Sequence, residues 1–344
     1  GNQPMLSKNG NLVLVFNGEI YNFMEIREKL EAKGYSFASN TDSEVILYAY
    51  EEYGPDCLKL FNGMFAFAIW DSKKKELFIA RDRIGVKPLY YYYKNGKFLF
   101  ASEVKALLQY KEIKRALNES CLKQIILYAF PINGETLLKD IVELKPGHYL
   151  ILKNSKIKIE KYWDLHVRET NENESYYVNK VEDLLFKSVQ RRLISDVPLG
   201  ISLSGGIDSS VLVAVASKIK EEPIKTFTIG FSEYDEDCIN AKLVAEQFNT
   251  DHTEIHLKYQ DLIKAFVKVL WHMEVPYSRP GMIPVYYLSN KIREKLTVSL
   301  SGEGSDEILI GEVTLFSTAI AEDERFNTIL TNIGQSLTIE DSIV

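Results

Sequence analysis

The sequence contains 344 residues, more than one compact domain usually holds, so two domains are the first expectation. Apolar residues make up 46% and charged residues 26%, which excludes a disordered or fibrous chain. The net charge of -7 comes without a basic stripe, and no apolar run approaches the ~20 residues of a membrane-spanning helix. Neither a nucleic-acid partner nor a membrane partner is therefore predicted.

The first half of the chain predicts short strands separated by turns. Aromatic and β-branched residues concentrate in 12–16, 64–70, 76–80, 89–93 and 97–100. The link Asn95-Gly96 between the last two strands is typical of a hairpin. Helices are predicted at 23–33 and 43–53, and Thr41 and Glu44 have the spacing of a capping box at the start of the second. This half should be an α+β domain with an antiparallel core.

The second half predicts alternating strands and helices after a polar linker at 168–175. Strands are expected at 199–203, 226–231, 252–256 and 297–300, and helices at 176–193, 209–220, 240–247, about 260–272 and 284–295. Such alternation, with nearly unbroken apolar strands, indicates a parallel sheet covered on both faces. We therefore expect one domain at residues 1–167 and another at 176–344.

The three cysteines, Cys57, Cys121 and Cys238, lack the paired spacing of a zinc site or a disulfide framework. We expect them to be buried small side chains in a protein of the reducing cytoplasm. The sequence opens with Gly1 and shows no signal peptide, and its tail from about Gly311 loses the earlier periodicity. We therefore expect sequence beyond both ends.

A glycine-rich loop follows the predicted strand at 199–203 and opens the next helix. Its sequence, SGGIDSS at 204–210, lacks the Gly-Lys-Ser ending of a Walker motif. Paired glycines let backbone N-H groups approach an anion, and the helix directs its positive end at the same point, so a polyphosphate is expected there. An acid in such a loop needs a bridging cation, which assigns Asp208 to Mg²⁺. The plainer alternative is a Gly-Gly turn in which Asp208 caps a helix.

This loop resembles the pyrophosphatase-type loop of enzymes that adenylate a carboxylate with ATP, and asparagine synthetase is the most similar family. The segment at 226–231 looks like that family's second strand, and the segment at 301–307 (SGEGSDE) resembles its second signature. Read without the first loop, SGEGSDE could be only an acidic helix start. The resemblance implies ATP contacts through Ser202, Ser204, Gly205, Gly206, Asp208, Ser209, Ile229, Ser301 and Gly302. It implies that Glu303 faces the acceptor amino acid, and that Asp208 and Asp306 share the metal.

The segments at 17–22 (NGEIYN) and 41–44 (TDSE) resemble the glutaminase domain of amidotransferases that use an N-terminal cysteine nucleophile. In that family the Asn17 side chain and the Gly18 N-H form the oxyanion hole, and Glu19 and Asp42 join them in binding glutamine, whose ammonium the two acids hold. Developing negative charge needs fixed donors, and an amine needs carboxylates, so the chemistry fits. The alternatives are an Asn-Gly turn and an Asp beside a helix start. The run at 81–90, although family-like, is interpreted as an ion-paired structural turn.

Three departures from the family pattern stand out. The nucleophilic cysteine lies upstream of the family's Gln-Pro-Met, which here is Gln3-Pro4-Met5, and Cys57 lacks the adjacent free amino group that activates such a nucleophile. The chain as written is therefore not expected to hydrolyse glutamine. Segment 309–312 (LIGE) replaces the family's Gly-Gly-Tyr, and segment 279–281 (RPG) stands where many relatives carry Asp-Pro-Ser.

The resemblance implies a fold and a reaction. The fold is an α+β domain of the N-terminal-nucleophile-hydrolase type, with layered antiparallel sheets, followed by an α/β ATP-pyrophosphatase-like domain. The reaction is glutamine-dependent synthesis of asparagine from aspartate, with Mg²⁺ and ATP, giving AMP and pyrophosphate, and relatives suggest a homodimer. A lactam-forming or other carboxylate-adenylating synthetase of the same fold and a noncatalytic scaffold are the alternatives.

Overall fold

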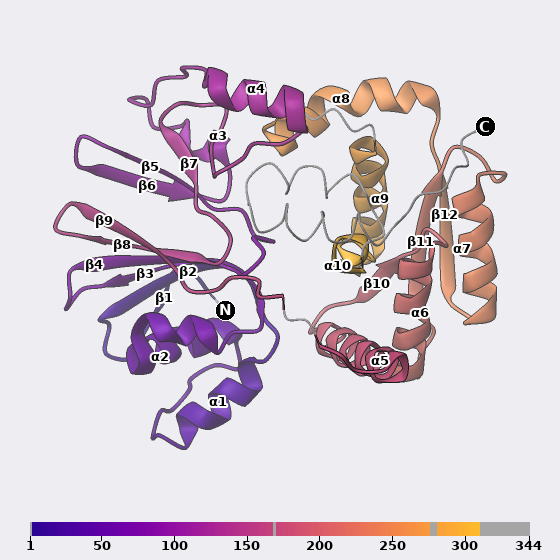
Figure 1. Ribbon diagram of the computed structural model, residues 1–344, viewed down its shortest axis with the longest axis horizontal. Coiled ribbons are helices and arrows are strands. Elements are labelled where there is room, and N and C mark those ends of the chain that lie inside the picture. Colours follow the sequence, from indigo (N-terminus) through magenta and orange to yellow (C-terminus); the bar gives the residue numbers. More distant parts are fainter. Residues whose placement is uncertain (1, 168–169, 276–280, 310–344) are drawn as a thin grey trace. The chain divides into compact units, whose positions relative to one another are not determined.

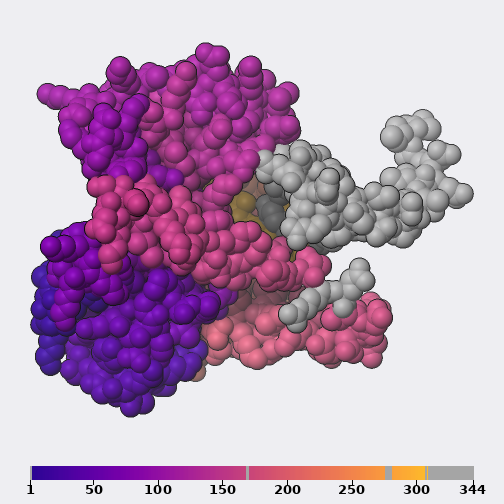
Figure 2. All heavy atoms as spheres, turned by 60° about the vertical axis from the view of Figure 1, so that its left-hand side comes forward, coloured from indigo at the N-terminus to yellow at the C-terminus, as the bar shows by residue number. Residues whose placement is uncertain are grey.

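The computed structural model describes residues 2–167, 170–275 and 281–309 (Figure 1; Figure 2, coloured atoms). Its contacts divide the chain into two compact units. The first unit comprises residues 1–194 and 264–282, and the second comprises 195–263 and 283–344. The predicted domain limits, 1–167 and 176–344, stay a prediction.

The first unit contains two antiparallel sheets among its described residues. One sheet has the strand order β1-β2-β3-β4-β8-β9 and the other has the order β6-β5-β7. The strands are β1 (Met5–Leu6), β2 (Leu12–Ile20), β3 (Gly63–Asp71), β4 (Glu76–Arg81), β5 (Tyr90–Lys94), β6 (Lys97–Ala101), β7 (Ile141–Glu143), β8 (His148–Lys153) and β9 (Lys156–Lys161). The helices are α1 (Phe23–Glu31), α2 (Asp42–Tyr53), the 3-10 helix η1 (Gly54–Lys59), α3 (Val104–Leu107), α4 (Glu119–Tyr128) and α5 (Glu174–Arg192).

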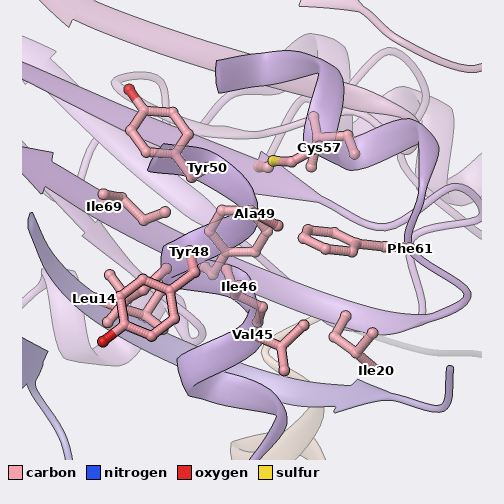
Figure 3. Packing of buried hydrophobic residues seen from close by; sticks show 14 of the residues in the cluster. Leu14, Ile20, Val45, Ile46, Tyr48, Ala49, Tyr50, Cys57, Phe61 and Ile69 are labelled. Atoms are coloured by element: carbon pink, nitrogen blue, oxygen red, sulfur yellow. The ribbon is translucent and has the colours of Figure 1, made fainter. Parts of the chain in front are cut away.

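Strand β3 shows how this unit is layered, because successive side chains of a strand point to opposite faces. Phe65, Phe67 and Ile69 belong to the cluster that buries α1 and α2 against the large sheet (Figure 3). Ala66 and Ala68 belong to the cluster on the other face, where side chains of β5 and β6 pack. The remaining face of the small sheet packs against α3. The layers of the unit therefore follow in this order: helices α1 and α2, the large sheet, the small sheet and helix α3.

The structure extends and corrects the strand expected at 12–16. Strand β2 pairs with β3 over its whole length, from Leu12 opposite Asp71 to Ile20 opposite Gly63. The NGEI residues predicted to follow the strand thus lie within it. The hairpin prediction is confirmed, since Lys94 pairs with Lys97 and both Asn95 (φ 53°) and Gly96 (φ 72°) have positive φ.

The predicted capping box of α2 is wrong. Thr41 is the N-cap residue but makes no side-chain bond to the helix, and its hydroxyl pairs with Ser39 instead. The Glu44 carboxylate accepts from the backbone N-H groups of Ala38 (2.8 Å) and Ser39 (2.7 Å) in the preceding loop. In this loop the carboxylate gains two backbone N-H donors, whereas the capping box would give it only one, the N-H of the N-cap residue.

The described part of the second unit contains one parallel sheet with the strand order β12-β11-β10-β13. The strands are β10 (Leu199–Ser202), β11 (Lys225–Gly230), β12 (Asp251–His256) and β13 (Val298–Leu300). The helices that begin in or belong to this unit are α6 (Ile207–Ile219), α7 (Glu236–Gln247), α8 (Tyr259–Met273), α9 (Met282–Lys295) and α10 (Ser305–Leu309).

Strand β11 is covered on both faces, as predicted. Phe227 is buried in a cluster with Ile292 of α9 and Leu296 just after it. Gly230, on the opposite face, has Cys238 of α7 so near that a Cβ would lie 2.6 Å from its sulfur. Helices α6 and α7 lie together beside the sheet (Figure 1).

These findings confirm the expected fold class, an α+β part with layered antiparallel sheets followed by a parallel α/β part. The elements between residues 104 and 161, from α3 to β9, were not anticipated from the sequence. Within the described ranges, no helix is both long and apolar enough to cross a membrane.

Candidate active site

The glycine loop between β10 and α6 contains two glycines with different surroundings. Gly205 has φ +80°, and a Cβ there would lie 2.4 Å from the backbone nitrogen of Ala241 in α7. Gly206, the N-cap residue of α6, has φ -68° and only the Ser204 hydroxyl within 4 Å of a Cβ, at 3.5 Å. The fold therefore demands glycine at position 205, whereas the space over Gly206 is open to a ligand.

Hydrogen bonds within the loop hold its shape. The Ser209 hydroxyl is buried, donates to the Gly206 carbonyl (3.2 Å) and lies 3.1 Å from the Ser204 hydroxyl. The Ser204 backbone N-H donates to the same Ser209 oxygen at 3.3 Å. Ser209 thus acts on the loop conformation in this structure, and Gly206 presents its backbone at the first turn of α6.

The second loop, after β13, contacts the first. Strands β10 and β13 are parallel neighbours, and the chain leaves β10 toward β11 on the other side. Their carboxyl ends therefore form a topological switch point, where open α/β sheets bind ligands. A Cβ on Gly302 would lie 2.9 Å from the Asp208 Cβ and 3.0 Å from the Ser209 nitrogen, so only glycine permits this approach. Ser305 donates its hydroxyl to the Gly302 carbonyl at 2.8 Å and fixes the second loop.

A cavity of about 370 Å³ gathers other predicted residues of the second unit. Ser202, Ser301 and Glu303 line it, together with residues of α9 and β13 that include Arg293 and Ser299. The Ser202 hydroxyl lies 3.0 Å from that of Ser299. Ile229, half-buried near the end of β11, is not among the residues that line this cavity.

Three acids of the two loops are without partners among the described residues. The carboxylates of Asp208, Glu303 and Asp306 make no hydrogen bond or ion pair with any other described residue, and Asp306 is exposed in the first turn of α10. In the same part of the chain, no group of three or more His, Cys, Asp or Glu residues could hold a metal ion. The unpaired carboxylates of Asp208 and Asp306, the two residues expected to bind the metal, suit Mg²⁺. This ion takes one or two protein carboxylates and completes its shell with phosphate oxygens and water.

The first unit holds the predicted glutamine-binding residues near the end of β2. Gly18 is in close contact with β3, where a Cβ would lie 2.1 Å from the Met64 carbonyl oxygen. Asn17 and Glu19, two residues apart on the strand, share the opposite face and are both exposed. The Asn17 amide donates to the Ser102 hydroxyl at 3.4 Å.

Asp42 reaches the same strand from the start of α2. One of its carboxylate oxygens accepts from the Ile20 backbone N-H at 3.0 Å. Burial raises the pKa of Asp42 above its ordinary value of 3.8, against the lowering effect of that hydrogen bond. The structure thus brings Asn17, Gly18, Glu19 and Asp42 to one end of the large sheet.

Glu44 holds the loop that precedes Asp42. Its side chain is buried, and it accepts the Ser39 hydroxyl (2.6 Å) in addition to the two backbone N-H groups. Burial acts to raise the pKa of Glu44, but the hydrogen bonds from Ala38 and Ser39 outweigh it and keep that pKa below its usual value. Glu44 is ionised and fixed, which orients the start of α2.

The turn at 81–90 is structural, as predicted, although its ion pair has an unforeseen partner. Arg81 pairs with Glu143 of β7 (2.9 Å) rather than with its neighbour. The fully buried Asp82 accepts from the backbone N-H groups of Phe65, Val86 and Lys87 at 2.9–3.1 Å.

The cysteines are free and buried, and burial raises the pKa of each thiol. None of Cys57, Cys121 and Cys238 therefore offers an accessible thiolate nucleophile. Of the departures noted in the sequence, Arg279, Pro280 and residues 310–312 lie outside the described residues.

Three features near the candidate site were not predicted from the sequence. They are the positions of Ser102 and Glu274 and the binding of the Glu44 carboxylate to the loop before α2. Ser102 lies between a strand and a short helix, a usual position for a polar capping residue, and this signal could have drawn attention to it. Glu274 contacts residues about 170 positions earlier, and no local pattern could have indicated that.

Comparison with known families matches both halves of the chain. Residues 1–163 match the model of a glutamine amidotransferase domain, and residues 180–336 match the model named asparagine synthase. The chain joins a glutamine amidotransferase of the layered antiparallel type to a parallel-sheet synthase, and this domain pair defines its class. Within that class it belongs to the asparagine synthetase (glutamine-hydrolysing) family.

Curated relatives agree with this assignment. Asparagine synthetase [glutamine-hydrolyzing] 1 of Bacillus subtilis is 35% identical over 314 residues, 90% of this chain and 49% of that protein. Asparagine synthetase [glutamine-hydrolyzing] 3 of the same organism is 34% identical over 340 residues, 94% of this chain and 55% of that protein. A protein of Penicillium rubens named amidase chyE is 31% identical over 90% of this chain and 49% of its own length. The chain thus spans about half the length of these relatives.

Solved structures align only weakly. A glutamine phosphoribosylpyrophosphate amidotransferase from Bacillus subtilis aligns with a TM-score of 0.34 and 16% identity, over 76% of this chain and 52% of that chain. A score of this size supports no argument, and the family assignment depends on the sequence matches.

Proposed function

We propose that the protein makes an amide from a carboxylate, ATP and glutamine-derived ammonia, and that the carboxylate is the aspartate side chain. The carboxylate oxygen attacks the α-phosphorus of ATP and pyrophosphate leaves. Ammonia then attacks the acyl carbon and AMP leaves, which gives asparagine. The observation that carries the proposal is the contact of Gly302 with Asp208 and Ser209, because it joins, at the start of α6, the two loops that we propose to bind ATP.

The pyrophosphate end of ATP would occupy the loop at 204–209. The backbone N-H groups at the start of α6 point outward from a helix whose dipole favours negative charge. The open space over Gly206 supports this role, because a side chain there would meet the ligand rather than the protein. Ser204 and Ser209 shape the loop, and Gly205 permits its packing on α7.

Asp208 and Asp306 would hold Mg²⁺. The support is their lack of any partner among the described residues and the contact between the loops that carry them. When bound, the ion would neutralise the phosphate oxygens and stabilise the leaving pyrophosphate.

The remaining predicted residues of the second unit divide into two roles. Ser202, Ile229, Ser301 and Gly302 would contact the nucleoside part of ATP, mainly through backbone. Glu303 would face the acceptor amino acid, whose ammonium needs a carboxylate, and its unpaired state in the cavity wall supports this role.

The first unit would supply ammonia from glutamine. Asn17 and the Gly18 N-H would stabilise the oxyanion, and Glu19 and Asp42 would bind the glutamine ammonium. A thiol nucleophile is also needed, and the burial of Cys57, Cys121 and Cys238 argues that none of the three provides it.

An isotope experiment on the protein encoded by the complete gene tests the proposal. With Mg²⁺, ATP, ammonium and aspartate labelled with ¹⁸O in its side-chain carboxylate, one ¹⁸O should appear in AMP, because that oxygen leaves with the phosphate. Asp208→Asn should abolish the label transfer, whereas Asp237→Asn, at an exposed acid in the first turn of α7, should not. Formation of ADP and phosphate, or of unlabelled AMP, contradicts the proposal.

The same assay separates the alternatives. Label transfer from a different carboxylic acid, without ammonia, indicates a lactam-forming enzyme. Absence of pyrophosphate release with any acid indicates a scaffold. We further propose a cytoplasmic location, which the three free thiols support, and a homodimer, which sedimentation of the purified protein tests.

A further inference from the structure

Glu274 is hydrogen-bonded to the start of the short helix α3, which is far away in the sequence. It follows α8, within the asparagine synthase family match, yet residues 264–282 belong to the same compact unit as residues 1–194. Its carboxylate accepts from the backbone N-H groups of Val104 and Lys105, both at 2.6 Å. These are the first two residues of α3, and the Glu274 side chain is only 11% exposed.

Further contacts of Lys105 add to this attachment. The Lys105 ammonium lies 3.3 Å from the Glu274 carboxylate and donates to the Trp271 carbonyl at 3.2 Å. It also lies 5.5 Å from the centre of the Trp271 ring. Glu274 has φ +60°, a conformation that costs a non-glycine residue free energy and persists where surrounding contacts enforce it.

The segment just before α3 contacts the predicted oxyanion hole. Ser102 precedes Val104 by two residues, and its hydroxyl accepts from the Asn17 amide at 3.4 Å, across 85 positions of sequence. An amide group rotates about its last side-chain bond unless a partner holds it. The position of Ser102 therefore affects the direction in which Asn17 presents its donor group.

We infer that Glu274 and Ser102 are positioning residues for glutamine hydrolysis, through which the end of α8 sets the orientation of the Asn17 amide. This inference rests on the proposed glutaminase function of the first unit. Neither residue would touch glutamine. A change in the contact between Glu274 and α3 would reach Asn17 through Ser102, so a residue within the asparagine synthase match influences the rate of ammonia release.

The inference predicts a selective kinetic effect. An oxyanion hole acts in the transition state, so disturbing its orientation lowers kcat and leaves the KM for glutamine nearly unchanged. With the complete protein, Ser102→Ala and Glu274→Gln should each lower kcat for glutamine hydrolysis roughly 3- to 10-fold, a fraction of the effect of losing a donor entirely. Synthesis with added ammonia should stay the same, and thermal melting would confirm that both variants fold.

A matched control comes from Glu103, which also pairs with Lys105 (2.8 Å) but is half-exposed and does not bind the N-H groups of α3. Glu103→Gln should leave kcat unchanged. If it lowers kcat as much as Glu274→Gln does, the inference is overturned.

A double-mutant cycle with Asn17→Ala distinguishes positioning from general destabilisation. In that background Ser102→Ala and Glu274→Gln should cause no further loss of kcat, because the group that they position is gone. Losses that multiply, or an unchanged kcat in the single variants, overturn the inference while the proposed function stands. If the unaltered complete protein releases no glutamate from glutamine, the glutaminase proposal fails and the inference fails with it.

Discussion

Two adjacent glycines of the phosphate loop serve different purposes, although they look equivalent in the sequence. Gly205 has a positive φ and its Cα faces α7 at a distance that no side chain tolerates. Gly206 has a backbone conformation open to any residue and empty space beside it. The first glycine is needed for folding, and the second leaves space for the proposed ligand.

This difference predicts opposite outcomes for two matched substitutions. Gly205→Ala should lower the free energy of unfolding by about 2–5 kcal/mol, from strain and overlap with α7. Gly206→Ala should change it by less than about 1 kcal/mol and still reduce pyrophosphate release more than 10-fold, since the methyl group occupies the ligand's place. Denaturant unfolding and a pyrophosphate assay check both. Equal stability losses would contradict the assignment of Gly206 to ligand binding.

The buried carboxylate of Asp42 is expected to lower the stability of the folded protein while it strengthens the binding of glutamine. Because burial raises its pKa in the folded state, the ionised carboxylate costs stability at neutral pH, and the cost disappears as pH falls through that raised value. Asp42→Asn should therefore melt at an equal or higher temperature than wild type at pH 7, with the difference vanishing in acid. Its KM for glutamine should rise at least about 10-fold, because the ammonium loses a charged partner.

The pH dependence of the unaltered protein gives an independent check on Asp42. Its KM for glutamine should begin to rise at a higher pH than an ordinary aspartate would produce. A flat KM down to pH 4 would show that this carboxylate does not bind the ammonium.

At the scale of elements, one buried acid organises the turn between β4 and β5. Asp82 accepts from three backbone N-H groups, on β3 and within the turn, and so ties the end of β4 to its neighbour. A side chain that satisfies several buried donors cannot be removed without leaving them unpaired.

Asp82→Ala should therefore lower the free energy of unfolding by about 3–5 kcal/mol. Asp82→Asn, which keeps one acceptor oxygen, should cost less. Asp56 offers a control, because its ion pair with Lys59 is exposed, and Asp56→Ala should cost no more than about 0.5 kcal/mol. Urea unfolding of the three variants measures the series, and similar costs for Asp82→Ala and Asp56→Ala would contradict the assigned role.

At the scale of the whole molecule, the chain forms two compact units, and the proposed ATP site belongs entirely to the second. A ligand that binds only the folded form of one unit stabilises that unit by mass action. The first unit gains nothing directly from the nucleotide.

Mg²⁺ and ATP at 100 times the dissociation constant should therefore stabilise the second unit by about 2.7 kcal/mol. Hydrogen exchange should slow in β10 and α6 and stay unchanged in β2 and β3. Calorimetry should show one of two transitions moving upward. Equal protection of both units would argue against an ATP site confined to the second.

Much of the fold, and the types of residue in the candidate site, could be predicted because they depend on local sequence patterns. The Asn95-Gly96 hairpin, the alternating strands and helices of the second half and the glycine loop all depend on residues close together in sequence. The limits of elements were less predictable. Strand β2 continues through Asn17, Gly18 and Glu19 because β3 pairs with it that far, and Glu44 bonds to a loop rather than to its own helix.

The amino-acid sequence alone indicates which chemical groups the protein carries: a glycine-rich loop, acids in two loops and an Asn-Gly-Glu segment, each with its own local signature. Which of these groups come into contact depends on the fold. The contact of Gly302 with Asp208, the bond between Asn17 and Ser102, and the attachment of Glu274 to α3 all join residues 85 or more positions apart. Local propensity acts between near neighbours, whereas burial of apolar surface in layered sheets brings distant segments together, so such contacts leave no pattern in the sequence.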